Sequence, residues 1–283
     1  MTELFHKDRV AVVTGAASGI GRSAALTLAA QGMRIAMVDV DADRLASAAG
    51  EVEGKAGGAD RVLAKAFDVA DAKAMSNFAQ EVLDRFEAPA LLMNNAAMFV
   101  HGGEGDVLAP LDLWHRVFAV NFFGVLNGVA AFAPAMLASG ARAMIVNTGS
   151  KQGLTHPPGN PSYNTVKAAV NAYTQNLARD LRERPGSKVS AHLLVPGWTT
   201  TGDSTHRPGA WLPEQVVAHM LAALVRDDFY IICPDDETTP EMDRKRILWQ
   251  AFDMVENRPA LSRWHPDYKD AFAAYMLRDL DRG

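Results

Sequence analysis

The chain has 283 residues, of which 48% are hydrophobic and 22% are charged, and its formal net charge is −5. This composition is typical of a folded globular protein and excludes a disordered chain, and the length suits one large α/β domain. The negative net charge argues against nucleic acid or an anionic membrane as a partner. The single cysteine, Cys233, cannot form an internal disulfide, which is typical of a reducing compartment.

The N-terminal segment lacks an apolar run of signal-peptide length, and we identify no apolar run of 18 residues further along. We therefore expect a cytoplasmic protein with no membrane partner. The histidines and the cysteine do not follow the spacing of metal ligands, so no metal is expected.

Short apolar runs alternate with longer amphipathic segments along residues 1–234. Strands are predicted at 9–14, 33–39, 62–69, 90–94, 143–147, 189–195 and 229–233. Helices are predicted at 19–31, from 42, and at 111–137, 162–182 and 214–226. This alternation predicts an α/β domain with right-handed crossovers, a doubly wound seven-stranded parallel sheet (Rossmann fold) with helices on both faces.

Residues 235–283 break the alternation and are predicted to form a helical C-terminal extension. One helix is expected from Pro240 to about Val255, with Thr238 and Glu241 spaced as a capping box, and a last helix from Asp267. The aromatic side chains of this extension are too numerous to be left in water. They could pack on the same domain, cover a partner subunit or close over a substrate pocket, and the sequence leaves these alternatives open.

A glycine-rich turn, Thr14–Gly21 (TGAASGIG), joins the first strand to the first helix. Gly15 permits a sharp turn, Gly19 lets the backbone approach a pyrophosphate, and Gly21 lets the helix lie close to the strand. The N–H groups at the helix start then face the phosphates. Glycine spacing alone is a weak signal, but a strand before it and a helix after it form the context of a dinucleotide site rather than of a structural turn.

Asp39 ends the second strand, where a carboxylate can accept hydrogen bonds from the adenosine ribose and repel a 2′-phosphate. The flanking residues Ala17 and Val40 are uncharged, and Arg44 is expected one turn into the next helix. The pattern therefore favours NAD over NADP. A plain helix N-cap role for Asp39 is compatible with this preference.

Tyr163 and Lys167 lie one turn apart on a predicted helix and share one face. Because an ammonium group favours the phenolate, the pair predicts a tyrosine pKa shifted from about 10 towards neutrality. Ser150 follows the fifth strand, at the carboxyl edge of the sheet, where doubly wound folds bind their ligands.

Together these motifs resemble the short-chain dehydrogenase/reductase family over about residues 7–233. The residues that carry the resemblance are TGAASGIG, Asp68-Val69, Asn94-Asn95-Ala96, Asn121, Ser150, Tyr163-x-x-x-Lys167 and Pro196-Gly197. The resemblance implies that Tyr163 exchanges a proton with the substrate oxygen, to which Ser150 hydrogen-bonds. It also implies that Lys167 lowers the tyrosine pKa and holds the nicotinamide ribose, and that Asn121 holds a water that relays the proton.

The resemblance further implies a bound NAD. Asp68 and Val69 would contact adenine, Asn95 and Ala96 would line the ribose region, and the Thr199 backbone and Thr201 hydroxyl would meet the nicotinamide carboxamide. The full set of implied cofactor-binding residues is Gly15, Ser18, Gly19, Ile20, Gly21, Asp39, Asp68, Val69, Asn95, Ala96, Tyr163, Lys167, Pro196, Gly197, Thr199 and Thr201.

By this resemblance the protein is expected to be an NAD-dependent alcohol dehydrogenase or carbonyl reductase acting on a small secondary alcohol or ketone. The candidate pocket wall, Met98, Phe99, Gln152, Leu154, His156, Trp198 and Trp211, would suit an apolar or aromatic substrate, although each residue could equally serve packing. A non-catalytic NAD-binding regulator is the main alternative. Dehydration or epimerisation usually comes with a larger C-terminal domain than the extension provides.

Three features depart from the family pattern. Ala97 stands where glycine is usual, and the short segment after Pro196 predicts a reduced lid over the substrate. Residues 229–240 (FYIICPDDETTP) replace a glycine-rich ending that commonly builds the tetramer interface. A homodimer through the helices beginning near Leu111 and Ser162 is therefore the cautious expectation, with a homotetramer as the alternative.

Overall fold

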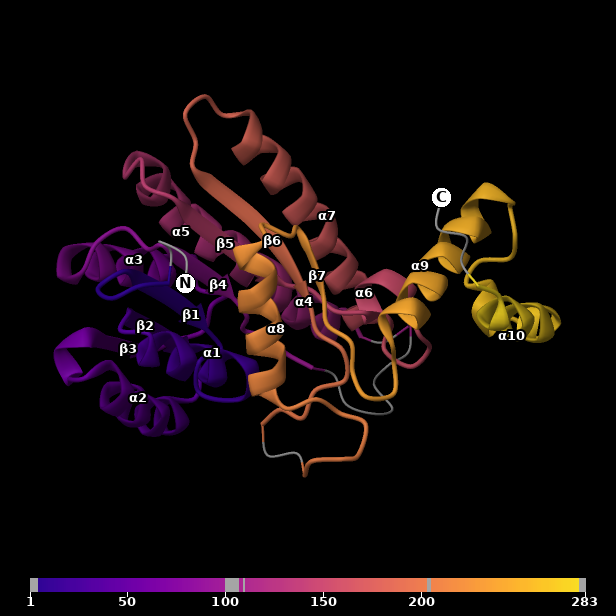
Figure 1. Cartoon of the computed structure of the whole chain (residues 1–283), viewed down its shortest axis with the longest axis horizontal. Helices are drawn as coiled ribbons and strands as arrows, with labels where there is room; N and C mark the ends of the chain where they lie inside the picture. Colours follow the sequence, from indigo (N-terminus) through magenta and orange to yellow (C-terminus); the bar gives the residue numbers. More distant parts are fainter. Residues whose placement is uncertain (1–4, 100–106, 109, 203–204, 280–283) are drawn as a thin grey trace.

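The computed structural model describes residues 5–99, 107–108, 110–202 and 205–279, and its centre is one open parallel sheet (Figure 1). The strands are β1 (Val10–Thr14), β2 (Arg34–Asp39), β3 (Val62–Ala66), β4 (Leu91–Asn94), β5 (Ala143–Thr148), β6 (Val189–Val195) and β7 (Tyr230–Ile232). They follow the order β3-β2-β1-β4-β5-β6-β7, and every neighbouring pair is parallel. The predicted doubly wound seven-stranded sheet is confirmed.

Helices cover both faces of the sheet (Figure 1). One face carries α1 (Gly19–Ala30), α2 (Ala42–Ala56) and α8 (Pro213–Val225), and the other carries α3 (Ala72–Arg85), α5 (Gly124–Ala138) and α7 (Pro161–Glu183). Along β1, Ala11 and Val13 enter one core cluster while Val10 and Val12 enter the other. Both sides of the strand are therefore buried, which explains its uninterrupted apolar sequence.

The order of the strands reverses at β1, which pairs with β2 on one side and β4 on the other. Chain connections leave this point in opposite directions, and in doubly wound folds such a point places the ligand-binding crevice beyond the carboxyl ends of the strands, here β1 and β4. The shorter helices α4 (Leu111–Phe118) and α6 (Gln152–Thr155) follow β4 and β5. Sequence periodicity did not predict α6, because a single helical turn has too few residues to show a period.

The predicted helix over 111–137 is one helical run interrupted by a π-helical turn at Ala119–Phe123. By length and composition this run, Leu111–Ala138, could cross a membrane, so the expectation of no such apolar stretch is wrong. Of its most apolar window, 44% is buried inside the fold. Phe132 and Met136 belong to the core beneath the sheet, and a core helix of this kind meets the same criteria.

The C-terminal extension contains α9 (Pro240–Val255) and α10 (Lys269–Leu277), with a 3-10 turn at Pro266–Tyr268 where the last helix was predicted to begin. The predicted capping box at Thr238 is wrong. The N-cap is Thr239, whose hydroxyl accepts a hydrogen bond from Met242 N at 3.2 Å. Thr238 Oγ1 instead accepts from Arg246 at 3.3 Å, because the chain turns one residue later than the spacing suggests.

The extension projects from the body of the domain beside α6 (Figure 1). Trp249 is buried within it, with ring centroids 5.2 Å from Phe272 and 5.1 Å from Tyr275, and the Arg258 guanidinium lies 4.5 Å from the Trp249 ring. These aromatic side chains therefore pack mainly on one another. The contact with the body is made by α9, which lies against α6.

Replacing two glycines inside helices by alanine should change the stability of the protein in opposite directions. A Cβ on Gly128 in α5 would lie 2.1 Å from the Asn94 Oδ1, whereas a Cβ on Gly54 in α2 would meet open space. We expect Gly128→Ala to lower the free energy of unfolding by about 1–3 kcal/mol through overpacking. We expect Gly54→Ala to raise the free energy by about 0.5–1 kcal/mol, because alanine loses less backbone entropy in a helix. Urea denaturation of both variants measures these changes in the free energy of unfolding. Changes of the same sign in both variants would contradict the close packing of α5 on β4.

Candidate active site

The glycine-rich turn lies at the carboxyl end of β1 and is packed too tightly for side chains. Gly15 has φ +66°, and a Cβ there would lie 2.8 Å from Ala96 Cα, while a Cβ on Gly21 would lie 2.1 Å from the Gly15 carbonyl oxygen. The N-cap of α1 is Ser18, and its side chain makes no capping hydrogen bond. The first N–H groups of α1, at Gly19 and Ile20, are therefore left to face an anion. This cradle fits the pyrophosphate of a dinucleotide.

Asp39 fixes the shape of this turn. Its Oδ2 accepts a hydrogen bond from Ala17 N at 3.0 Å, and its Oδ1 accepts from Asp41 N at 3.1 Å. The N-cap of α2 is Asp41, whose side chain accepts from Arg44 N, so the alternative N-cap role for Asp39 is wrong. Asp39 instead joins the end of β2 to the phosphate-binding turn.

Two arginines line a groove of about 270 Å³ beside the turn, together with Ser18, Gly19 and Gly202. Arg22 comes from α1 and pairs with Glu51, and Arg44 comes from α2. The sequence analysis placed Arg44 one turn into the next helix and did not identify Arg22. The position of Arg22 in the first turn of α1 was a signal that could have identified it. The approach of α2 to α1 brings both arginine side chains to one groove.

The segment after β3 is held against α5. Val69 is buried against Gly124, and its carbonyl oxygen accepts a hydrogen bond from Asn127 Nδ2 at 2.9 Å. The Asp68 carboxylate accepts from Ala70 N at 2.9 Å. These contacts hold the predicted adenine-side residues in a fixed loop over α5.

Across the crevice, Thr14 ties β1 to the segment after β4. Its Oγ1 accepts hydrogen bonds from Asn95 N at 2.9 Å and Ala96 N at 3.1 Å, and Asn95 Nδ2 donates to the Thr14 carbonyl oxygen at 3.2 Å. The structure thus brings Asn95 and Ala96 to the glycine turn. The part of Thr14 was not anticipated, because the contact joins residues far apart in the sequence.

Ser150, Tyr163 and Lys167 meet at the carboxyl end of β5, where the side chains of Ser150 and Tyr163 are hydrogen-bonded. Tyr163 and Lys167 lie on α7 and are only 3% and 2% exposed. Lys167 Nζ donates to the Thr148 carbonyl oxygen at 2.9 Å and lies 5.5 Å from the centre of the Tyr163 ring. The geometry therefore gathers a hydroxyl, a phenol and an amine at one point.

The pKa of Tyr163 shifts in the direction opposite to the sequence prediction. Burial raises the pKa of Tyr163, and its hydrogen bond with Ser150 opposes the rise only in part. Burial lowers the pKa of Lys167 to about 7. The predicted shift of the tyrosine pKa towards neutrality is thus wrong for the chain by itself. Burial disfavours both the phenolate and the ammonium, and helical spacing carries no information on burial.

Asn121 lies in the π-helical turn and is fully buried. Its Nδ2 donates to the carbonyl oxygens of Val117 and Met98, each at 3.0 Å. Its Oδ1 is buried and has no hydrogen-bond partner among the described residues. A π-helical turn often marks a functional position, and an unpaired buried acceptor can take a hydrogen bond from a water or a ligand.

The segment after β6 spans the other side of the crevice. A Cβ on Gly19 would lie 3.2 Å from the Thr201 side chain, so this segment reaches the glycine turn. Thr199 Oγ1 donates to the Gly197 carbonyl oxygen at 3.1 Å. Described residues between Pro196 and Leu212 form turns and one bridge, Thr199 with Trp211, and no helix.

The predicted pocket wall is only partly assembled around the phenol. Phe99 stacks on Tyr163, with ring centroids 4.5 Å apart and planes at 24°. The His156 ring meets Gln250 Nε2 of α9 at 3.0 Å. Trp211 Nε1 donates to the Asp236 carboxylate at 3.0 Å. The sequence left open that the extension closes over the pocket but did not identify these residues, because nothing local indicates which of them contact the predicted pocket wall.

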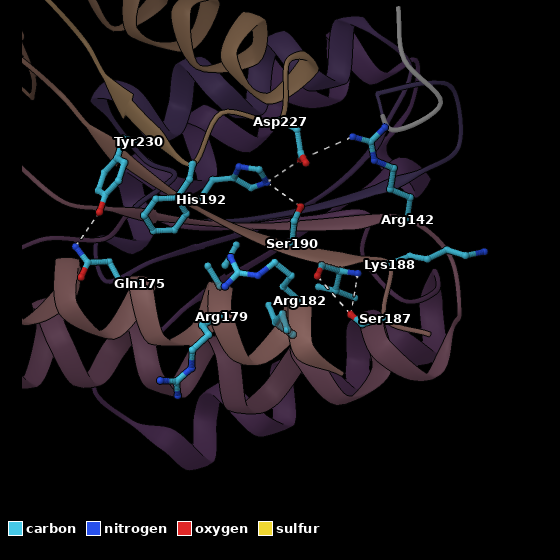
Figure 2. A pocket seen from close by; sticks show the side chains of 15 residues that line it. Arg142, Gln175, Arg179, Arg182, Ser187, Lys188, Ser190, His192, Asp227 and Tyr230 are labelled. Carbon is cyan, nitrogen blue, oxygen red and sulfur yellow. Dashed lines mark hydrogen bonds and ion pairs between the residues drawn. The ribbon is translucent and has the colours of Figure 1, made fainter. Parts of the chain in front are cut away.

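A larger concavity, of about 840 Å³, lies at the opposite edge of the sheet (Figure 2). It is lined by the starts of β6 and β7 and by the end of α7, and Arg142, Arg182 and Lys188 contribute to its wall. None of the predicted site residues lines it. The concavity is therefore separate from the crevice.

Fold and site together define a nucleotide-binding α/β protein with serine, tyrosine and lysine at the carboxyl edge of its sheet. The sequence matches the family described as short chain dehydrogenase over residues 9–208. The chain belongs to the short-chain dehydrogenase family, and the resemblance deduced from its motifs is confirmed.

Several relatives match most of the chain. The 1-deoxy-11-beta-hydroxypentalenate dehydrogenase of Streptomyces avermitilis is 32% identical over 85% of this chain and 90% of that protein. The 2-(R)-hydroxypropyl-CoM dehydrogenase of Xanthobacter autotrophicus is 34% identical over 82% and 93%. SadH of Mycobacterium tuberculosis, named as an oxidoreductase, is 38% identical, but the match spans only 61% of its length and 62% of this chain.

Solved structures agree with the fold. A short-chain dehydrogenase/reductase from Burkholderia phymatum in complex with NAD has a TM-score of 0.80 and 29% identity, covering 92% of this chain and 98% of that one. A metagenomic short-chain oxidoreductase in complex with NADP has a TM-score of 0.67 and 27% identity, covering 81% and 98%. The neighbours therefore include complexes with both nucleotides.

The buried amine should make stability depend on pH. Since the pKa of Lys167 is about 7 when folded and 10.5 ordinarily, the unfolded chain holds a proton that the folded chain lacks between these values. Stability should therefore rise with pH, by about 1 kcal/mol per pH unit. Urea denaturation from about pH 7 to pH 9 should show this rise in the native protein and in Lys188→Met, an exposed control, but not in Lys167→Met. Parallel curves for all three proteins would contradict the shift.

Proposed function

We propose that the protein is an oxidoreductase that transfers a hydride between NAD(H) and a secondary alcohol or ketone, with Tyr163 as the general acid and base. The observation that carries this proposal is the meeting of Ser150, Tyr163 and Lys167 beside the glycine-turn crevice. When bound, NAD supplies the hydride acceptor, and the protein supplies orientation and a proton. Family membership supports the same reaction class.

The crevice supports a bound dinucleotide along its whole length. The pyrophosphate would lie against the N–H groups at the start of α1, near Gly19. Adenine would lie by Asp68 and Val69, and the nicotinamide end by Thr199 and Thr201. Lys167 would then hold the nicotinamide ribose. Tight packing at Gly15 and Gly21 keeps this cradle free of side chains.

In the reductive direction, negative charge develops on the carbonyl oxygen of the substrate. The hydroxyls of Ser150 and Tyr163 donate to that oxygen, and Tyr163 gives up its proton. Asn121 Oδ1, buried and without a partner among the described residues, can accept a hydrogen bond from the water that returns the proton. In the oxidative direction each of these transfers reverses.

NAD is the proposed nucleotide because the Asp39 carboxylate lies beside Ala17, where it would repel a 2′-phosphate. Arg22 and Arg44 in the adjoining groove are the observation that favours NADP. Both are offset by carboxylates, Arg22 by Glu51 and Arg44 by Asp41, so the local charge does not turn positive.

An apolar or aromatic substrate is proposed from two exposed aromatic side chains of the predicted pocket wall. Phe99 is 49% exposed although its ring stacks on Tyr163, and Trp198 is 42% exposed. Apolar surface beside a buried polar pair suits a ligand with one oxygen and an apolar body. The complete set of Ser150, Tyr163, Lys167 and Asn121 disfavours a non-catalytic nucleotide-binding role.

A homodimer through α4–α5 and α7 remains a proposal, as does a cytoplasmic location. Leu111 and Phe123 on the α4–α5 run are 71% and 52% exposed. A second subunit packed against this run would cover such exposed apolar side chains.

Tyr163→Phe should abolish most turnover while leaving NAD binding intact. The phenylalanine keeps the ring that stacks on Phe99 and removes only the proton donor. We expect kcat to fall by about 10²–10⁴-fold, the usual contribution of a general acid. Turnover is followed by NADH absorbance with a panel of secondary alcohols, and binding by calorimetry with NAD. Near-native turnover in this variant would exclude Tyr163 as the proton donor.

Asp39→Ser should shift the nucleotide preference towards NADP. Removing the carboxylate removes the repulsion of a 2′-phosphate and hydrogen bonds to the ribose of NAD. We expect the ratio of kcat/KM for NAD to that for NADP to fall at least about tenfold, equivalent to about 1.4 kcal/mol. Asp43→Asn, an acidic residue in the first turn of α2, is the matched control and should leave the ratio unchanged. A native enzyme that already prefers NADP would refute the assignment.

A further inference from the structure

A buried group of three charges lies next to Ser150. The Lys151 ammonium contacts two carboxylates, with Nζ 3.2 Å from Asp235 Oδ2 and 2.8 Å from Asp243 Oδ2. The three side chains are only 17%, 4% and 8% exposed, in that order. Lys151 belongs to the segment between β5 and α6, Asp235 follows β7, and Asp243 lies on α9. The group therefore joins three parts of the chain at the edge of the site.

Asp235 also holds the segment that follows β6. Its Oδ2 accepts a hydrogen bond from Trp198 N at 3.0 Å, and its Oδ1 accepts from Glu237 N at 3.1 Å. A Cβ on Gly197 would lie 2.7 Å from Asp235 Oδ2, so the backbone approaches the carboxylate as closely as glycine permits. One carboxylate thus fixes both Lys151 and the backbone proposed to meet the nicotinamide.

α9 touches the site a second time. Gln250, further along this helix, meets the His156 ring at 3.0 Å, and His156 is the left-handed residue that ends α6. Lys151 precedes α6 and His156 follows it, so α9 holds both ends of this short helix. α6 in turn carries part of the candidate pocket wall, Gln152 and Leu154.

The charges are balanced by neighbours from several elements. Burial would raise the pKa of Asp235, but the Trp198 N–H and the Lys151 ammonium outweigh burial and lower it. Burial raises the pKa of Asp243, which Lys151 offsets in part, with Arg246 acting in the same direction as Lys151. Removing one member of such a buried group leaves an uncompensated charge, which is costly. The three segments are therefore strongly held together.

We propose that Lys151, Asp235 and Asp243 are positioning residues through which the C-terminal extension sets the Ser150 segment against the Gly197–Trp198 segment. By this proposal three side chains of the extension, Asp235, Asp243 and Gln250, support the active site. The kinetic consequence rests on the proposed function, since it concerns how well the nicotinamide end and the substrate oxygen are aligned. The positioning itself is a property of the chain alone and can be measured without turnover.

The test compares Asp243→Asn with Glu241→Gln in the full-length protein. Glu241 lies on the same helix and pairs with Lys245, so its substitution removes an acidic charge of α9 away from the buried group. Hydrogen–deuterium exchange of the peptide spanning 196–200 reports the Trp198 amide, and calorimetry reports NAD affinity. We expect Asp243→Asn to speed exchange of that amide and to raise the Kd for NAD about tenfold, with kcat/KM falling about 10²-fold. Glu241→Gln should match the native protein in all three, and Asp243→Glu should restore part of each.

Unchanged exchange at Trp198 together with unchanged NAD affinity in folded Asp243→Asn would overturn the proposal. If that variant does not fold, Gln250→Ala, which removes only the second contact of α9, must show the same changes to a smaller extent, and native behaviour in that variant would equally overturn it. A native protein that binds no NAD would refute the proposed function instead. The exchange comparison would still decide whether α9 fixes the Trp198 segment.

Discussion

The amine of Lys167 is almost completely buried, and the chemistry of the site depends on how the fold accommodates a buried amine. Its Nζ donates to the Thr148 carbonyl oxygen at the end of β5, and α6 lies against the same part of α7. The approach of α6 requires Gly153, where a Cβ would lie 2.6 Å from the Lys167 carbonyl carbon. Since burial brings the pKa of Lys167 to about 7, small changes in its surroundings change its charge near neutral pH. The segments that surround it therefore control the charge state of the site as well as its shape.

These surroundings come from residues that the parallel sheet brings to one edge. Thr14 links the end of β1 to Asn95, Thr201 reaches back to Gly19, and Asp235 holds Trp198. Each link crosses between segments that are distant in the sequence, and together they bound the crevice on both sides. The doubly wound topology brings the strand ends to one edge of the sheet. The side-chain links then fix the distances between the segments that follow those strands. The segments around the crevice are therefore tied to one another and not only to their own strands.

The amino-acid sequence predicts the parts of this site that depend on local spacing. The glycine-rich turn and the Tyr163–Lys167 spacing are local patterns, and both lie in the elements expected for them. Burial and long-range contacts could not be predicted from local sequence patterns. The direction of the Tyr163 pKa, the groove with Arg22 and Arg44, and the return of Asp235 to the crevice all depend on segments that meet only in the folded chain. The capping error at Thr238 has another cause, because neighbouring threonines offer equivalent hydroxyls and only the backbone turn selects Thr239.

The burial of Tyr163 also constrains how a proton can leave the site. At 3% exposure the phenol has little direct contact with solvent, so the buried groups around it would take part in replacing a proton that it gave to the substrate. Lys167 has a pKa of about 7, which suits a group that both accepts and releases a proton at neutral pH. Asn121, in its π-helical turn, offers a buried amide oxygen, Oδ1, that has no hydrogen-bond partner among the described residues. Desolvation thus opposes a permanently charged lysine, so the burial that shapes the site also sets the charge of its amine.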